Sequence, residues 1–409
     1  MSTWTIRRVG DMARLINGHP FDSHDFTPTG DVPLVRIRDI TAADFETYVP
    51  QHTVPQDKVL KDGDVVIGMD GDFNVIRWRR GAAALNQRVC ALRDTGVSDL
   101  RFLAYALPDH LKVINDLTYS TTVKHLSSGQ VTGLRITAPD RDDQGRIADY
   151  LDRETATIDA LIEKQRQLSD ALRTRRRAAV LARTGFLGVK PASAASSEPW
   201  LESAPSHWSR MHVRRLFDLT SGAGFPPELQ GVTDEELAFY KVRDLGRTDS
   251  YGRLGEPEDT ISRETADKLR AKVLPSGTLV MAKIGAALLL GRIRMATRPS
   301  CIDNNMLALS PKSLLYPRYA TYMLEGLLLD RLVQPGAVPS LNEREFRRTV
   351  FPVPPLDEQR EIADHLDRET AKIDALIAKA ERFIELAQER RSALITAAVT
   401  GQIEIPTED

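Results

Sequence analysis

The stretch I-A-D-Y-L-D-R-E-T-A-T-I-D-A-L-I, residues 147–162, occurs a second time as I-A-D-H-L-D-R-E-T-A-K-I-D-A-L-I, residues 362–377. Fourteen of the sixteen positions are identical, and the two copies begin 215 residues apart. Solenoid proteins repeat every 20 to 50 residues or so, so this period is too long for one of them. The repeat therefore indicates a duplicated chain with two similar halves.

Both copies have the periodicity of long α-helices, with matching residues at steps of four and three. The expected heptad seam comprises Ile147, Leu151, Glu154, Ile158, Leu161, Gln165, Leu168 and Leu172 in the first helix, and Ile362, Leu366, Glu369, Ile373, Leu376, Ala380, Phe383 and Ala387 in the second. Glu154 and Glu369 are matching polar interruptions of this seam. Thr184-Gly185 and Thr400-Gly401 predict the helix ends, because glycine readily adopts the left-handed cap conformation. About 43 residues at 1.5 Å each make a helix of about 65 Å. We expect each helix to bury its seam against the other.

The composition is typical of a soluble globular protein. The 409 residues are 42% hydrophobic and 27% charged, enough for two or three domains. The sequence contains neither a signal-peptide core nor an apolar run long enough for a membrane span, so we expect a cytoplasmic protein without a membrane partner. Two cysteines, Cys90 and Cys301, cannot build a disulfide framework or a zinc site. With a net charge of −2, any DNA binding must depend on local patches.

Outside the helices, the two halves share only a framework. For example, K-V-L-K-D-G-D-V-V-I at residues 58–67 matches K-V-L-P-S-G-T-L-V-M at residues 272–281. Such short β-rich runs, bounded by Gly, Asp and Asn, predict α+β domains. Residues 190–206, rich in Pro, Ala and Ser, read as a linker. Nearly identical helices joined to diverged domains suit the recognition of two different things at a fixed separation.

The segment P-P-L-D-E-Q-R-E-I-A-D-H-L-D, residues 354–367, followed by a long helix, resembles the specificity subunit of Type I restriction–modification systems, the HsdS family. The resemblance covers the whole chain, although the first helix departs from the pattern at its start, where residues 139–146 read P-D-R-D-D-Q-G-R. It implies an α+β fold with two diverged target-recognition domains. Two long helices separate them and pair as an antiparallel coiled coil, in a pseudo-two-fold duplicated arrangement.

The resemblance also implies domain boundaries and a function. The expected parts are a target-recognition domain at 1–140, a helical spacer region at 141–186, a linker at 187–206, a second target-recognition domain at 207–355 and a second helical spacer region at 356–402. The chain would read an asymmetric bipartite sequence in double-stranded DNA, with two modification (methyltransferase) subunits and restriction (endonuclease/translocase) subunits as partners. No cofactor is expected on this chain; S-adenosylmethionine, ATP and Mg are expected on the partner subunits.

Motifs of self-contained enzymes are missing from the sequence. It has no G-x-x-x-x-G-K-[ST] phosphate loop, no H-E-x-x-H zinc motif and no Asn/Asp-Pro-Pro-aromatic motif of an adenine methyltransferase. Pro108-Asp109 and Pro139-Asp140 could open a nuclease motif, but its second part does not follow. The repeated Asp-Arg-Glu-Thr is interpreted as a solvated or partner-facing stretch, since its carboxylates point in different directions on a helix. We therefore expect no catalytic residues and no metal ligands.

Candidate DNA contacts are basic, amide and hydroxyl side chains in loops, because these bind phosphates and read base edges. They are Asn74, Arg77, Arg79, Arg80, Asn86, Gln87, Arg88, Ser120, Thr121, Thr122, Lys124, Lys283, Asn304, Asn305 and Ser340. Resemblance to the family places the segment 120–124 and its counterpart 336–340 near DNA.

Other interpretations stay open at this stage. The cluster Arg77–Arg80 could form a plain solvated turn, and the amides at 86–87 and 304–305 could simply hold turns. The arginines at 173–177 and 390–391 could interact with helix C-termini, or contact phosphates or a modification subunit. The alternative function is a non-catalytic coiled-coil scaffold whose globular ends bind proteins.

Overall fold

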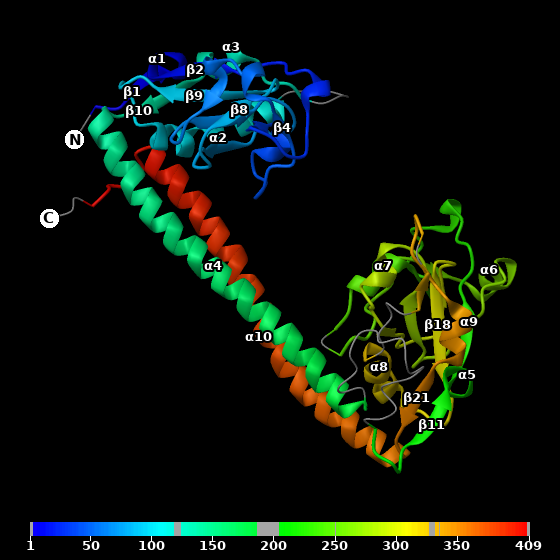
Figure 1. Ribbon diagram of the computed structural model, residues 1–409. Helices are drawn as coiled ribbons and strands as arrows, with labels where there is room; N and C mark the ends of the chain where they lie inside the picture. Colours follow the sequence, from blue (N-terminus) through cyan, green and yellow to red (C-terminus); the bar gives the residue numbers. More distant parts are fainter. Residues whose placement is uncertain are drawn as a thin grey trace. The chain divides into compact units, whose positions relative to one another are not determined.

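The structure is a computed structural model that describes residues 3–117, 124–185, 204–249, 251–326, 332–334 and 336–406 (Figure 1). The chain forms two compact units, with residues 1–164 and 383–409 in unit 1 and residues 165–382 in unit 2. Most of the expected linker, from residue 190 to residue 203, lies outside the described residues. Each unit contains one globular domain and a part of each long helix.

The domain of unit 1 is α+β. One four-stranded sheet has the order β2-β9-β6-β7, a second has the order β4-β3-β8-β5, and β1 pairs with β10. The strands are β1 (Thr5–Arg8), β2 (Ala13–Asn17), β3 (Val32–Val35), β4 (Tyr48–Val49), β5 (Val59–Leu60), β6 (Val65–Gly68), β7 (Val75–Arg77), β8 (Ala83–Leu85), β9 (Val89–Asp94) and β10 (Arg135–Ala138). The helices of this domain are α1 (Val9–Met12), α2 (Leu100–Leu117) and α3 (Ser128–Gly133).

The domain of unit 2 repeats the central part of this topology. Its sheets have the orders β12-β18-β15-β16 and β14-β13-β17, with β11 paired to β21 and β19 to β20. The strands are β11 (Ser209–His212), β12 (Phe217–Ser221), β13 (Leu237–Tyr240), β14 (Thr260–Ile261), β15 (Leu279–Ala282), β16 (Arg294–Met295), β17 (Ser300–Ile302), β18 (Met306–Pro311), β19 (Val333–Gln334), β20 (Ser340–Leu341) and β21 (Val350–Val353). The helices of this domain are α5 (Val213–Leu216), α6 (Arg263–Lys268), α7 (Ala286–Leu289), α8 (Pro317–Glu325) and α9 (Glu343–Arg348).

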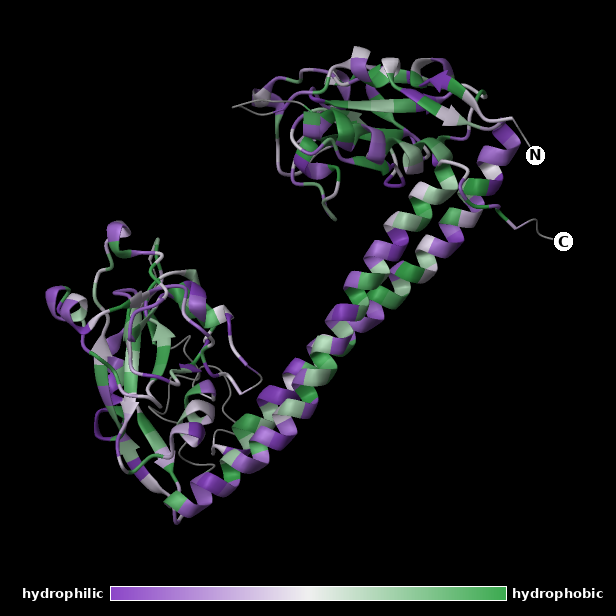
Figure 2. Ribbon diagram, turned by 180° about the vertical axis from the view of Figure 1, so that it is seen from behind, coloured by the Kyte–Doolittle hydropathy of each residue, from purple (hydrophilic) through white to green (hydrophobic). Residues whose placement is uncertain are grey.

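The central strands are apolar on both faces because each face has its own core. In β6, Val65 and Ile67 pack in the cluster that contains Phe102 of α2, whereas Val66 packs with Trp78 on the other side. In unit 2, Leu279 and Met281 of β15 face the cluster that contains α8, and Val280 faces the opposite one. Figure 2 shows hydrophobic strands in the sheets of both domains. The continuous apolar run V-V-I at 65–67 is therefore explained by a strand that is buried on both faces.

The two long helices are α4 (Arg141–Arg183) and α10 (Leu356–Val399), each followed within two residues by a glycine with positive φ, as predicted. They pair antiparallel. In unit 2, Arg173 lies 2.6 Å from Glu381, while Arg176, further along α4, lies 2.9 Å from Asp374, earlier in α10. In unit 1, Asp159 lies 2.9 Å from Arg391. The expectation that the helices bury one face against each other is confirmed.

The seam differs from the predicted one at alternate positions. Leu161 and Leu168 are 43% and 48% exposed, and Leu376 and Phe383 are 52% and 41% exposed. The buried positions are instead the next residues along each helix, Ile162 and Ser169 in α4, with Ile377 and Ile384 half-buried in α10. Likewise, Thr155 and Thr370 take the places predicted for Glu154 and Glu369. Where both neighbours are apolar, as at Leu161-Ile162 and Phe383-Ile384, either phase fits, and the sequence alone favoured the wrong one.

Candidate nucleic-acid interface

Four loops meet at one edge of the domain in unit 1. They are residues 17–19, 69–72, 86–88 and 124–128, and we call this group loop edge 1. Backbone hydrogen bonds hold them together: Met69 N–H donates to the carbonyl of Arg88 at 2.9 Å, and Leu126 N–H donates to the carbonyl of Met69 at 2.7 Å. The arrangement leaves a shallow hollow of about 350 Å³ lined by Gln87, Arg88 and His125, among others.

The same loops meet in unit 2, at residues 221–223, 283–285, 303–305 and 339–343, which we call loop edge 2. Here Lys283 N–H donates to the carbonyl of Asn305 at 2.8 Å, and Leu341 N–H donates to the carbonyl of Lys283 at 2.8 Å. The two sets of bonds match one for one. Met69 therefore corresponds to Lys283, Arg88 to Asn305 and Leu126 to Leu341.

A glycine fixes the central turn at each loop edge. A Cβ on Gly18 would lie 1.8 Å from the carbonyl oxygen of Asn86, and one on Gly222 would lie 2.0 Å from that of Asp303. Any side chain at these positions would push the turn at 86–88, or the turn at 303–305, away from the sheet. The framework thus places both turns at the same site while leaving their side chains free to differ.

Arg88 is constrained in both its backbone and its side chain. Its backbone is left-handed, with φ of 67°, a conformation that costs a non-glycine residue about 1 kcal/mol. Its guanidinium lies 3.5 Å from Asp70 and 3.1 Å from the His125 ring, yet the side chain is 55% exposed. His125 is in turn 2.6 Å from Asp70. A half-exposed guanidinium held from behind in this way is pre-organised to bind a guanine edge or a phosphate.

The other predicted contacts in unit 1 lie in different settings. Gln87 and Asn74 are exposed, Asn74 being just beyond the turn that follows β6. Asn86 is 8% exposed and its side-chain oxygen accepts from Gln87 N–H at 2.9 Å, so this amide holds the turn. The Lys124 ammonium donates to Asn115 Oδ1 at 2.9 Å. Ser120, Thr121 and Thr122 lie outside the described residues.

The basic cluster 77–80 does not act as one group. Arg80 folds back onto the domain, where it donates to the Asp39 carbonyl at 3.0 Å and stacks 3.7 Å above the Phe45 ring. Arg77 points toward helix α4 and lies 3.5 Å from Asp152. Arg79 is exposed. The structure thus disperses the cluster, and only Arg79 is left on an open surface.

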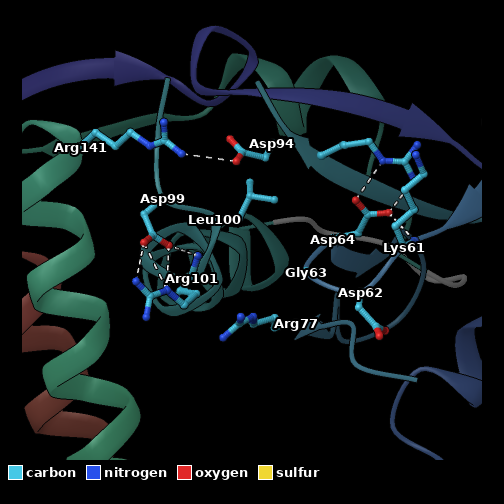
Figure 3. Close-up of a pocket in the computed structure, with 11 residues that line it drawn as sticks. Lys61, Asp62, Gly63, Asp64, Arg77, Asp94, Asp99, Leu100, Arg101 and Arg141 are labelled. Carbon is cyan, nitrogen blue, oxygen red and sulfur yellow. Dashed lines mark hydrogen bonds and ion pairs between the residues drawn. The ribbon is translucent and has the colours of Figure 1, made fainter. Parts of the chain in front are cut away.

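Arg77 also lines a polar pocket of about 330 Å³ between the sheet and α2 (Figure 3). Ion pairs occupy its walls: Arg93 lies 2.6 Å from Asp64, and Arg101 lies 2.7 Å from Asp99. Burial opposes the charge of Asp99, but hydrogen bonds from Arg101 outweigh it and hold the pKa of Asp99 below its ordinary value. Arg141 of α4 also lines the pocket and lies 3.5 Å from Asp94, so most of the charged side chains in this pocket are paired.

In unit 2, the predicted residues gather at loop edge 2. The Lys283 ammonium donates to Ser221 Oγ at 3.0 Å and lies 3.5 Å from Glu343. Asn304 and Asn305 are exposed, and the Asn305 N–H donates to Asp303 at 2.7 Å. Ser340 is half-buried beside them. The two loop edges therefore present different side chains on one framework: arginine and glutamine in unit 1, two asparagines and a lysine in unit 2.

Sequence reasoning missed the residues that hold each domain on its long helix. Tyr105 of α2 donates to Asp152 at 2.7 Å and lies 3.2 Å from Thr155. Tyr322 of α8 does the same with Asp367 at 2.6 Å and Thr370 at 3.1 Å. We call these groups, with the arginines described next, the docking clusters. The repeated Asp-Arg-Glu-Thr thus binds the chain's own domains, which corrects its interpretation as solvated or partner-facing.

An arginine and a glutamine complete each docking cluster. Arg101 bonds to Asp149 and Asp99, and Arg318 donates to Asp367 at 2.6 Å. Gln144 and Gln359 each accept a backbone N–H from the domain, at 3.0 and 2.8 Å. The signal was present in the sequence, since R-F-L-A-Y at 101–105 and R-Y-A-T-Y at 318–322 share Arg and Tyr four residues apart, on one helix face.

Two kinds of feature were not found in the described part of the chain. No helix there is long and apolar enough to cross a membrane. Within the same residues, no group of three or more His, Cys, Asp and Glu side chains could hold a metal ion.

Comparison with known proteins gives a consistent result. Residues 1–169 and 233–385 match the family model described as Type I restriction modification DNA specificity domain. The chain is 25% identical to the Type I restriction enzyme EcoBI specificity subunit of Escherichia coli, over 98% of this chain and 86% of that protein. It is 20% identical to the EcoDI specificity subunit of the same species, over 98% of this chain and 88% of that protein.

A solved structure also resembles the chain. It comes from work on complex assembly and conformational transition of the type I R-M system, and superposes with a TM-score of 0.62 over 98% of both chains. The two sequences are 18% identical, so this likeness concerns the fold.

Proposed function

The chain belongs to the family of Type I restriction–modification specificity subunits, and from that premise we propose that it reads an asymmetric bipartite DNA sequence, one half with each unit. Loop edge 1 would read the first half-site and loop edge 2 the second. The observation that carries the proposal is the pairing of one framework with two chemistries, Arg88 in one unit where Asn305 stands in the other. Arginine suits guanine and asparagine suits adenine, so the two halves should differ.

The chain would direct the chemistry of other subunits. Its relatives are specificity subunits, which are non-catalytic members of their systems. We expect modification subunits to supply S-adenosylmethionine-dependent adenine methylation, and restriction subunits to supply ATP- and Mg-dependent cleavage. This chain would bind double-stranded DNA and hold those partners at the target.

Exposed apolar residues on the long helices support a partner that docks twice. Leu161 in unit 1 and Leu376 in unit 2 occupy the same repeat position and are 43% and 52% exposed. Leu168 and Phe383 form a second matched pair, 48% and 41% exposed. Isolated exposed leucines are common, but the same two positions exposed in both copies suggest a duplicated docking face. We propose that one modification subunit covers each copy.

Native mass spectrometry tests this stoichiometry. The wild-type chain should bind two modification subunits, and Leu376→Gln should leave one bound at concentrations that saturate the wild type. Leu314→Gln, at a similarly exposed leucine in unit 2 away from the repeat, should keep two. A stable one-to-one complex of the wild-type chain would contradict the duplicated face.

The DNA-reading proposal is tested by selection from random duplex DNA, with the modification subunit co-expressed. The expected result is a two-part sequence with a spacer of fixed length. Replacing residues 1–138 with the matching domain of another family member should then change only one half of that sequence. A scaffold that binds proteins through its globular ends would enrich no DNA sequence, and that outcome would refute the proposal.

A further inference from the structure

An apolar tip projects from loop edge 2. It is the turn between β15 and β16, in which the short helix α7 lies between Gly285 and Gly291. Leu289 and Leu290 are 57% and 60% exposed, whereas Leu288 is 1% exposed and anchors the turn in the core. Burying a leucine is worth roughly 1.5–3 kcal/mol, so the fold leaves a sizeable stabilisation unused at this tip.

The tip is continuous with the loops proposed to read DNA. Gly285 N–H donates to the carbonyl of Pro339 at 2.8 Å, and Ile284 forms a β-bridge with Ser340. Ile284 and Val338 add apolar surface there, being 38% and 59% exposed. Within unit 2, Figure 1 shows α7 at the end of the domain opposite β11 and β21, the strands next to the long helices.

The corresponding turn of unit 1 has different chemistry. Between β6 and β7 it carries Asp70 and Asp72, and its one large apolar residue after Met69, Phe73, is 2% exposed. The shared framework therefore does not require exposed leucines at this point. Their exposure is a property of the second domain alone, as expected for a residue that distinguishes one half-site from the other.

The charges around the tip favour DNA as its occupant. The exposed Arg292 immediately follows Gly291 and places a cation beside the tip. On the other side, Lys283 is 16% exposed and lies 3.5 Å from Glu343, so Arg292 is the cation that can reach a phosphate. The exposed amides of Asn304 and Asn305 lie alongside through the bond between Lys283 and Asn305. In duplex DNA, the apolar group that a side chain can reach beside phosphates and amide-reading base edges is the 5-methyl of thymine in the major groove.

We infer that Leu289 and Leu290 contact the 5-methyl group of thymine in the half-site read by unit 2. The inference rests on the proposed function and adds a specificity-determining contact to it. Arg292 stays near the backbone phosphates, while the leucines enter the groove. The second domain thus reads by apolar contact as well as by hydrogen bonds.

Deoxyuridine substitution tests the contact, because uracil pairs as thymine does but lacks the methyl. Each thymine of the second half-site is replaced in turn, and binding is measured with the full chain in complex with its modification subunit. The wild type should lose about fourfold in affinity at one or two of these positions, the loss that corresponds to one buried methyl-sized group. The double variant Leu289→Ala/Leu290→Ala should bind the thymine and uracil duplexes equally well.

Leu314→Ala is the matched control, since Leu314 is an exposed leucine of unit 2 outside loop edge 2; it should keep the wild-type uracil sensitivity. The inference is overturned if the wild type binds its target specifically yet ignores every uracil, or if the double variant keeps full sensitivity. It is also overturned if the double variant loses the modification subunit with unchanged sensitivity, which would make the tip a protein contact. A wild type without any sequence-specific binding would instead refute the proposed function itself.

Discussion

The two units agree where each domain meets its long helix and differ where its loops meet solvent. At the docking clusters, Tyr105 and Tyr322 bond to the same Asp and Thr of the repeat, at distances that agree within 0.1 Å. At the loop edges the backbone hydrogen bonds match, but the side chains differ. Arg88 in unit 1 and Asn305 in unit 2 occupy equivalent positions. The two copies therefore share the contacts that hold each domain on its long helix and differ in the side chains exposed at the loop edges.

The largest effect should come from the glycines under the turns. Gly222→Ala would force a Cβ to within 2.0 Å of the Asp303 carbonyl and displace the turn that carries Asn304 and Asn305. We expect about a 100-fold loss of affinity, similar to two mismatched base pairs, confined to the second half-site. Gly18→Ala should do the same to the first half-site, measured with duplexes altered in one half at a time.

Gly129 and Gly224 provide controls, since a Cβ at either meets nothing within 4 Å. Their alanine variants should bind both half-sites normally. If Gly222→Ala weakened recognition of both halves equally, the two loop edges would not be independent readers.

The second prediction exchanges chemistry between the equivalent positions. Arg88→Asn gives loop edge 1 the residue that loop edge 2 has at Asn305. The variant should lose about 10- to 100-fold in affinity for a guanine in the first half-site, and prefer adenine at that base pair. Methylation mapping on a target library checks this. An unchanged preference would show that Arg88 contacts phosphate only.

The third prediction compares two ion pairs at equivalent positions of the helix pair. Arg176 contacts both Asp374 and Glu325 and is 29% exposed, whereas Arg391 contacts Asp159 and is 36% exposed. Burial works against the charge of Arg176, but Glu325 and Asp374 outweigh it and raise its pKa.

Arg176→Ala leaves two carboxylates without this partner and should lower the free energy of unfolding by about 2 kcal/mol. Arg391→Ala should cost about 0.5 kcal/mol, as exposed pairs do. Chemical denaturation of both variants gives the comparison. Equal losses would mean that the third charge, Glu325, adds nothing in unit 2.

The docking tyrosines should have smaller effects than Arg176, because Phe keeps the ring and removes one hydroxyl. Tyr105→Phe and Tyr322→Phe should each cost about 1 kcal/mol in unfolding free energy. Tyr322 is 1% exposed and Tyr105 half-buried, so the loss at Tyr322 should be the larger. Double-mutant cycles with Asp152→Asn and Asp367→Asn isolate the bond; coupling near zero would show that packing alone holds the domains.

The sequence was sufficient for the duplication, the helix limits and the α+β domains, because repeats, caps and turn residues are local signals. Local signals did not determine which residues of each helix form the seam. Leu161 and Ile162 are both apolar, and the choice of Ile162 depends on Thr155, which the sequence marked as polar. Thr155 is tolerated in the seam because its hydroxyl donates to the Leu151 carbonyl at 2.6 Å within the helix.

The candidate site was predicted only in part, because local patterns show neighbouring residues and not long-range contacts. Asn86 to Arg88 were found as a loop between strands, and the structure places them at loop edge 1. Arg80 was grouped with Arg77 and Arg79 by adjacency, although its guanidinium stacks on Phe45, 35 residues earlier in the chain. Long-range contacts of this kind leave no trace in a local pattern.

The docking clusters limit which amino-acid substitutions the repeated stretch can accept. In the first copy, Asp152 and Thr155 bind the domain, Ile158 and Ile162 fill the seam, and Asp159 meets Arg391. Leu161 lies on the remaining face. Substitutions at these five positions would therefore disturb a domain contact, the seam or an ion pair, whereas the exposed side chains of the loop edges can change without such a loss. The two positions that do differ are Tyr150/His365 and Thr157/Lys372, and both residues of the second pair are exposed.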